Sequence, residues 1–257
     1  MRGRLQLRRR LELWRRWRLR RRKQQLSVFA LIHGAWHGGW AWDHLVPELE
    51  RAAHRVVAPD LPGDDVDADA PDYARVVVEA LAGADDVVVV GHSLGGLTAP
   101  LVAAARPVRR LVLLAALLPR PGRSLADQLR EDRGILLLPR GEGIETDAAR
   151  RSFWTDPELA TWHMYPDCDP AAAAAALARL RPQAATPQIR PTPLAAWPDV
   201  PAEYVVCAED RVVSPAWGAR AAAALGLPVR ELPGGHSPML SRPAELARLL
   251  TADAEAA

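Results

Sequence analysis

One short stretch, residues 87–98, constrains the fold of this chain more than any other. It begins with four consecutive valines, and such a run of β-branched apolar residues is typical of a short strand that is buried on both faces. A Gly-x-Ser-x-Gly motif follows at 91–95, and residues 97–105 then predict a helix. So tight a turn drives its central residue to positive φ, where bulky neighbours would clash. We therefore predict that Ser93 is held above the end of a sheet as a nucleophile.

The segments around this stretch alternate between strand and helix patterns, which predicts right-handed crossovers and a mostly parallel sheet with helices on both faces. This is an α/β fold, and 257 residues with 49% hydrophobic side chains suit one such domain. Strands are predicted at 27–33, 55–58, 87–90, 110–115, 203–208 and 229–232, and helices at 43–53 (with Asp43 as N-cap), 73–82, 97–105, 215–225 and 243–251.

The alternation breaks between residues 118 and 198, where no strand pattern is visible. Helices are predicted there at 124–133, 147–154 and 170–180. An excursion of this length is too long for a plain loop, so we expect a helical cap inserted after the fourth strand, with residues 26–117 and 199–257 forming the core. Trp154, Trp162 and His163 of the cap, together with Trp36, are candidates to bind substrate, although packing within the cap would explain the cap residues equally well.

The net charge of +2 conceals two parts of opposite sign. Residues 1–25 contain eleven Arg and one Lys against one Glu, a local charge of +11 that leaves −9 for the other 232 residues. A mildly acidic body does not suit nucleic acid. No run of 18 apolar residues predicts a membrane span, and the leader lacks the apolar core of a secretory signal, so we expect a cytoplasmic protein.

The leader itself has two interpretations. Leu7, Leu11, Trp14 and Trp17 fall at helical spacing, which would allow a basic amphipathic helix to contact an anionic membrane surface weakly or to act as a transit peptide. We favour the interpretation that residues 1–25 are disordered or loosely helical and take no part in the folded domain.

A serine hydroxyl needs an adjacent base, and that base needs a third group to orient it. His236 lies between a glycine pair and a predicted helix, at the end of the last strand. Asp210 follows the strand at 203–208, and Glu209 is its rival one residue out of phase. Ser93, Asp210 and His236 then occur in the chain order expected for a nucleophile elbow. The histidines at 37, 44, 54, 92 and 163 are weaker candidates for the base.

The oxyanion of an acyl-transfer reaction needs two backbone N–H donors. Leu94, directly after the nucleophile, supplies one. The second should come from the glycine-containing loop after the first strand, where we choose Ala35 over its neighbours Gly34 and Trp36. The histidines lack metal-ligand spacing and the two cysteines are isolated, so neither a metal nor a disulfide is predicted. The loop lacks a dinucleotide-binding pattern, and no cofactor is expected.

Four motifs, HGAWHGGWAWDHLVPEL, GHSLGG, CAEDR and GGHSPMLSRP, resemble those of the α/β-hydrolase superfamily. Within it, the chain is similar over about residues 27–252 to the plant methylesterase and hydroxynitrile lyase branch and its bacterial esterase relatives. The resemblance implies the same roles: Ser93 as nucleophile, Asp210 as acid, His236 as base, and Ala35 and Leu94 as oxyanion donors.

Two departures favour hydrolysis within this branch. Where the lyases carry a threonine after the first strand's histidine and a lysine after the catalytic histidine, this chain has Gly34 and Ser237. We expect a serine hydrolase that cleaves small or medium apolar carboxylic esters through an acyl-enzyme, as a monomer or homodimer. The alternatives are lyase-like cleavage of a C–C bond and a ligand-binding relative with little turnover.

Overall fold

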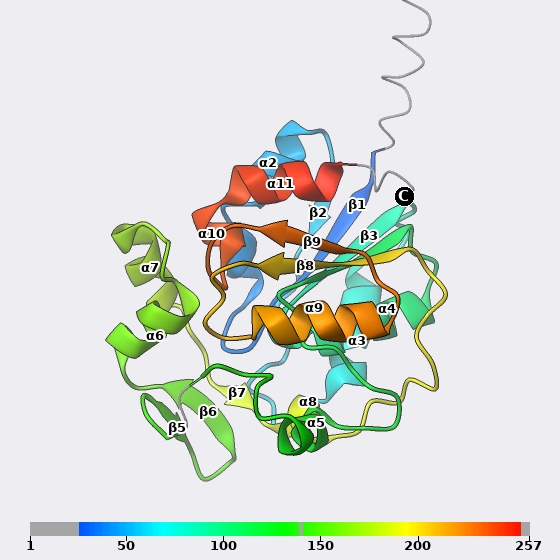
Figure 1. Cartoon of the computed structure of the whole chain (residues 1–257). Helices are drawn as coiled ribbons and strands as arrows, with labels where there is room; N and C mark the ends of the chain where they lie inside the picture. Colours follow the sequence, from blue (N-terminus) through cyan, green and yellow to red (C-terminus); the bar gives the residue numbers. More distant parts are fainter. Residues whose placement is uncertain (1–25, 139–140, 253–257) are drawn as a thin grey trace, which may run out of the picture.

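A six-stranded sheet forms the centre of the computed structural model, which describes residues 26–138 and 141–252 (Figure 1). Its strands run in the order β2-β1-β3-β4-β8-β9, and every neighbouring pair is parallel. The predicted α/β architecture is therefore confirmed. The strands are β1 (Val28–Ile32), β2 (Arg55–Val57), β3 (Val87–His92), β4 (Arg110–Leu114), β8 (Ala202–Cys207) and β9 (Val229–Leu232).

The order of the strands determines where a ligand can bind. The chain moves outward from β1 to β2 and then returns to the other side of β1 to form β3. Ligands of open parallel sheets bind beyond the carboxyl ends of the strands, at the point where the order reverses. The loops after β1 and β3 lie at this point, and they carry Ala35 and Ser93.

Helices cover both faces of the sheet, as Figure 1 shows. One face carries α2 (Val46–Arg51) and α11 (Pro243–Thr251), and the other carries α3 (Ala70–Ala80), α4 (Ala99–Ala105) and α9 (Pro215–Ala224). Because the sheet is covered on both sides, β1, β3 and β4 are buried along their whole length. This burial explains why their sequences read as continuous apolar runs rather than as alternating patterns.

Two predicted helix starts were wrong. The segment after β1 forms a short 3-10 helix, η1 (Gly39–Trp42), and α2 begins only at Val46, so Asp43 follows the end of η1 and is not the N-cap of α2. Pro47 explains the late start, because proline lacks an N–H and is favoured in the first turn. The carboxylate of Asp43 instead pairs with Arg179 at 2.7 Å.

The other helix, α3, begins three residues earlier than predicted. Asp69 accepts the N–H of Asp72 at 3.3 Å, and the carboxylate of Asp72 accepts the N–H of Asp69 at 3.1 Å. This reciprocal pair satisfies two backbone donors that the helix start would otherwise leave without partners.

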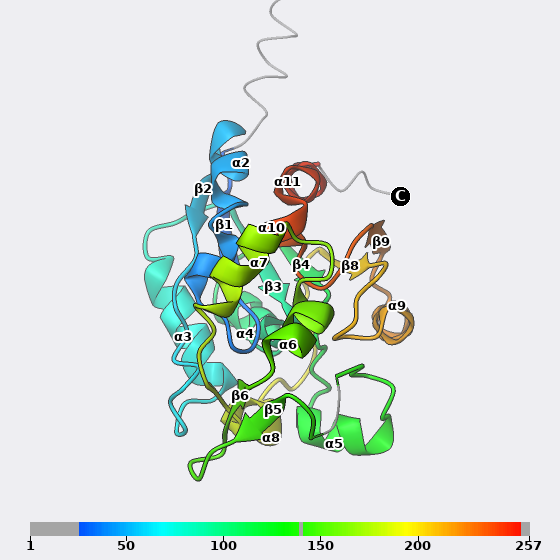
Figure 2. The same cartoon turned by 90° about the vertical axis from the view of Figure 1, so that its left-hand side faces the viewer.

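The segment between β4 and β8 contains strands as well as helices, which corrects the prediction of a purely helical insert. Figure 2 looks onto the carboxyl end of the sheet and shows α6 and α7 lying in front of it. The elements are α5 (Leu125–Glu131), β5 (Ile144–Thr146), β6 (Arg151–Trp154), α6 (Pro157–Met164), α7 (Pro170–Leu177), β7 (Gln183–Ala184) and α8 (Thr186–Ile189).

The predicted helix at 147–154 was wrong for an identifiable reason. Residues 151–154 form β6, which pairs antiparallel with β5 on one side and with β7 on the other. The partner Gln183–Ala184 lies some thirty residues further along the chain. Short segments of this kind adopt the conformation that their tertiary partners require, and local propensity is overridden.

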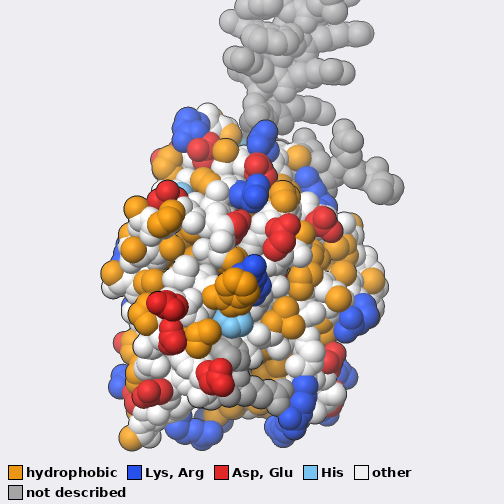
Figure 3. Space-filling model, turned by 60° about the vertical axis from the view of Figure 1, so that its left-hand side comes forward, with side chains coloured by type: hydrophobic (Ala, Val, Ile, Leu, Met, Phe, Trp, Pro, Cys, Tyr) orange, Lys and Arg blue, Asp and Glu red, His pale blue; other side chains and the backbone are white. Residues whose placement is uncertain are grey.

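Over residues 26–138 and 141–252, no helix is long and apolar enough to cross a membrane. On the face shown in Figure 3, Arg side chains are interspersed with acidic and apolar ones. The basic leader, residues 1–25, lies outside the described residues.

The capping pair of α3 gives a first prediction. Asp69→Ala should lower the free energy of unfolding by about 1 kcal/mol, because an N-cap aspartate contributes roughly that much. Urea unfolding followed by tryptophan fluorescence measures the change. Asp67→Ala, at an exposed position just before the helix, is the matched control. Equal stability of the two variants would show that the pair contributes nothing.

Candidate active site

Ser93 lies at the junction of β3 and the 3-10 helix η2 (Ser93–Leu97), and its φ is 52°. The positive φ expected from the motif is present. Added Cβ atoms would meet the Cβ of Ala99 at 2.6 Å from Gly91, and the carbonyl oxygen of His33 at 2.7 Å from Gly95. Only glycine allows the chain to approach so closely at these two positions. Gly91 and Gly95 therefore make possible the tight turn in which Ser93 has a positive φ.

The loops after β8 and β9 bring Asp210 and His236 together. Nδ1 of His236 lies 2.8 Å from Oδ2 of Asp210, and both side chains are only 2% exposed. The other carboxylate oxygen, Oδ1, accepts the backbone N–H groups of Val212 and Val213 at 2.7 and 3.0 Å. Because an ionised carboxylate only accepts, this contact assigns a proton to Nδ1 of His236 and leaves Nε2 free to act as a base.

His92 connects this pair to the elbow. Its Nε2 donates to the carbonyl oxygen of His236 at 2.8 Å, and the centroids of the two imidazole rings are 4.6 Å apart. The side chain of His92 thus points toward His236 and not into the position of a base for its neighbour Ser93. Burial lowers the pKa of His92 well below its usual value, so the ring is neutral. Its Nδ1 has no hydrogen-bond partner among the described residues.

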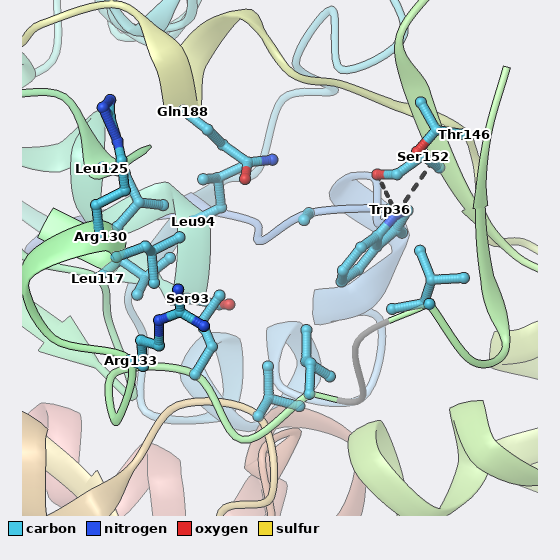
Figure 4. A pocket seen from close by; sticks show the side chains of 17 residues that line it. Trp36, Ser93, Leu94, Leu117, Leu125, Arg130, Arg133, Thr146, Ser152 and Gln188 are labelled. Atoms are coloured by element: carbon cyan, nitrogen blue, oxygen red, sulfur yellow. Dashed lines mark hydrogen bonds between the residues drawn. The ribbon is translucent and has the colours of Figure 1, made fainter. Parts of the chain in front are cut away.

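A cavity of about 610 Å³ opens in front of Ser93 (Figure 4). Leu94, Ala35 and Trp36 line it together with Ser93, and most of the remaining wall is apolar. Its volume falls within the usual range for a small-molecule site. Asp210 and His236 are not part of the described wall.

Of the four aromatic residues predicted to bind substrate, the described wall of this cavity includes Trp36 alone. Trp154 packs edge-to-face against Trp36, with ring centroids 5.6 Å apart, and supports it from outside. Trp162 is 57% exposed and stacks under the guanidinium of Arg211 at 3.6 Å. Nδ1 of His163 lies 2.7 Å from the carbonyl oxygen of Arg211.

Two buried histidines, His33 and the weaker base candidate His37, hold the loop after β1. Nδ1 of His33 donates to the carbonyl oxygen of Gly34 at 2.9 Å, and its Nε2 accepts the N–H of Leu61 at 3.1 Å. Nδ1 of His37 donates to the carbonyl oxygen of Ala35 at 2.9 Å. The His33 ring therefore donates through one nitrogen and accepts through the other. Burial lowers the pKa of His33 to about 4 and that of His37 to about 3, so both are neutral.

The same loop is tied to the segment between β4 and β8. The phenol of Tyr165 donates to Nε2 of His37 at 2.8 Å. The indole N–H of Trp36 donates to the hydroxyl of Ser152 at 3.1 Å, a contact drawn in Figure 4, and the carbonyl oxygen of Trp36 accepts the N–H of Arg181 at 2.8 Å. The spacing of His33 and His37 on either side of Ala35 was a signal in the sequence, but the partners of their Nε2 atoms, Leu61 and Tyr165, lie far away along the chain.

The described residues contain no group of three or more His, Cys, Asp or Glu side chains that could hold a metal ion. Both cysteines, Cys168 and Cys207, are free.

Curated proteins of plants and bacteria are similar in sequence to part of this chain. A carbendazim hydrolyzing esterase of Nocardioides sp. (strain SG-4G) is 35% identical over 136 residues, which are 48% of this chain and 52% of the relative. Methylesterase 7 of Arabidopsis thaliana is 36% identical over 110 residues, 38% of this chain and 42% of the relative. The chain thus spans about half of the length of these curated relatives, and the resemblance to esterases and methylesterases inferred from the motifs is confirmed.

The fold is shared over a longer span. The crystal structure of a pyrethroid hydrolase from Sphingobium faniae JZ-2 matches with a TM-score of 0.72 at 26% identity, covering 90% of this chain and 99% of the other. The model of the alpha/beta hydrolase family matches residues 29–249. With its parallel sheet, its serine elbow and a family match over most of its length, the chain belongs to the alpha/beta hydrolase family.

Proposed function

We propose that this protein is a serine hydrolase that cleaves carboxylic esters of small or medium apolar substrates through an acyl-enzyme. The observation that carries the proposal is the position of Ser93, which lies at positive φ on the wall of a mostly apolar cavity. The esterase names of the relatives support the same class of reaction. No cofactor takes part in this scheme, and we propose that the protein acts in the cytoplasm as a monomer or homodimer.

In the proposed reaction, Nε2 of His236 takes the proton of the Ser93 hydroxyl while Oγ of Ser93 attacks the ester carbonyl. Asp210 keeps the imidazole in the required tautomer and stabilises the imidazolium that forms. The protonated His236 then gives its proton to the leaving alcohol. Water, activated by the same histidine, hydrolyses the acyl-enzyme and restores Ser93.

The developing oxyanion would be stabilised by the N–H groups of Leu94 and Ala35, and the two buried histidines orient the second donor. A trans peptide directs its C=O and its N–H in opposite directions. The carbonyl of Gly34 turns toward His33, so the N–H of Ala35, in the same peptide unit, points away from His33. His37 holds the following peptide through the carbonyl of Ala35. Both peptide planes beside Ala35 are therefore restrained before substrate arrives, as oxyanion stabilisation requires.

Lyase chemistry is less well supported than hydrolysis. At Gly34, where the lyases of this branch carry a threonine, an added Cβ would lie 2.8 Å from the Cβ of Ser93. A threonine would therefore require the elbow or the loop to move. Ser237 stands where those enzymes carry a lysine, so no cation follows His236 to stabilise departing cyanide.

The nucleophile is tested by Ser93→Ala. Loss of a serine nucleophile typically lowers kcat by about 10⁶, so hydrolysis of p-nitrophenyl butyrate should fall to background. Covalent labelling by a fluorophosphonate should disappear in the same variant. Ser241→Ala, at a serine outside the site, is the control and should keep both properties. Turnover by Ser93→Ala close to that of the wild type would refute the mechanism, and labelled wild type without turnover on an ester panel would favour a ligand-binding relative.

The orientation of the oxyanion loop is tested by Tyr165→Phe. Removal of the phenol leaves Nε2 of His37 buried without its donor, so the loop should lose part of its restraint. We expect kcat to fall about tenfold with KM nearly unchanged, because oxyanion donors act on the transition state. Tyr73→Phe removes a buried phenol that contacts Gln183 and serves as the matched control. An equal loss in both variants, or a change in KM alone, would contradict the role.

The neutral histidines also predict a pH dependence of stability. Unfolding raises the pKa of His37 from about 3 toward 6.5, so below pH 6.5 the unfolded state binds a proton that the folded state does not. The free energy of unfolding should then decrease as the pH falls, by up to about 1.4 kcal/mol per pH unit for this residue. His37→Gln should reduce the slope between pH 6 and 5 in urea titrations, and His44→Gln, at an exposed histidine, should not. If the free energy of unfolding of His37→Gln and of His44→Gln depended equally on pH, His37 would have to be protonated in the folded protein.

A further inference from the structure

The charged side chains on the described wall of the large cavity all have one sign. They are Arg130 and Arg133, and no carboxylate lines that part of the cavity that the structure describes. The rest of the wall is apolar or carries neutral polar groups such as Gln188 and Thr146. A negatively charged substrate would therefore meet no like charge there.

The acidic residues nearest to Arg133 in sequence are already paired with other arginines. Arg130 is one of these paired arginines, and Asp127 partly compensates its charge. For Arg133, the described residues show neither an ion pair nor a hydrogen bond to the guanidinium. The pairs are Asp127–Arg130 at 2.8 Å, Glu131–Arg120 at 2.7 Å, Glu131–Arg123, and Asp132–Arg220 at 3.8 Å.

The backbone around Arg133 is held in place next to the loop that carries Asp210. The N–H of Gly134 donates to Oδ1 of Asp132 at 2.8 Å. The carbonyl oxygen of Ile135 accepts the N–H of Ser214 at 2.9 Å, so the segment pairs with the residues that follow Asp210. Figure 4 shows the side chain of Arg133 extending on the same side of the cavity as Ser93.

We propose that Arg133 selects esters that carry an anionic group, such as the half-esters of dicarboxylic acids. The apolar wall would hold the carbon chain, and the planar guanidinium would bind the free carboxylate with paired N–H donors. Because Arg133 is exposed, solvent screens the attraction, and we expect a preference of about tenfold or less over a neutral ester of the same length. This inference rests on the proposed esterase function.

The test compares three methyl esters of equal chain length that differ only in the terminal group. Monomethyl adipate carries a carboxylate, methyl adipamate a neutral amide and methyl 6-aminohexanoate an ammonium group. The measured quantity is kcat/KM at low ionic strength for the wild type, Arg133→Gln and Arg133→Glu. Arg248→Gln, at an exposed arginine of α11 outside the cavity, is the control.

The wild type should prefer the anionic ester to the neutral ester and the neutral ester to the cationic one, and added salt should weaken this order. Arg133→Gln should bring the anionic-to-neutral ratio close to one, Arg133→Glu should reverse the order, and Arg248→Gln should keep it. The inference is wrong, and the esterase function stands, if the wild type hydrolyses the three esters with kcat/KM values that do not depend on the charge of the terminal group. The same holds if Arg133→Gln keeps the wild-type ratio of anionic to neutral ester. If p-nitrophenyl butyrate is hydrolysed but none of the three methyl esters is, the inference is wrong and the esterase function stands. If p-nitrophenyl butyrate is not hydrolysed either, both are wrong.

Discussion

The close approach of two backbone segments at the carboxyl end of the sheet is the constraint on which the site depends. Gly95 lies against the carbonyl groups of Ile32, the last residue of β1, and of His33, which follows it, and Gly34 lies against the side chain of Ser93. No larger residue fits at either place without movement of the backbone. This contact brings the proposed nucleophile and the loop with the proposed second oxyanion donor into one wall of the cavity, even though they are some sixty residues apart in the chain.

Buried neutral histidines give that contact its rigidity. His33, His37 and His92 each donate one N–H to a backbone carbonyl, and burial keeps the rings uncharged. A buried polar group without a partner is costly, so such pairs resist being broken once they have formed. Tyr165 extends the set into the segment between β4 and β8. Hydrogen bonds thereby connect the loop after β1, which forms part of the cavity wall, to the segment between β4 and β8.

Most of the core could be predicted from the sequence, because its strands are buried on both faces and their apolar runs need no distant partner to be recognised. Residues 87–90 and 110–115 are examples. The segment between β4 and β8 could not be predicted in this way. There β6 is a strand only because β5 and β7 pair with it, and the local sequence of β6 does not indicate those partners.

By itself, the sequence determined the chemistry that is available at the elbow. The Gly-x-Ser-x-Gly spacing requires a positive φ at Ser93, and the strand-end positions of Asp210 and His236 follow from the alternation of strands and helices. Tertiary structure alone decided which side chains face the cavity. Trp36 does, Trp154 packs behind it, and Arg133 joins the wall because its segment pairs with the loop after β8. The physical reason is that a turn is determined by neighbouring residues, whereas a cavity wall is assembled from segments whose contacts depend on the whole fold.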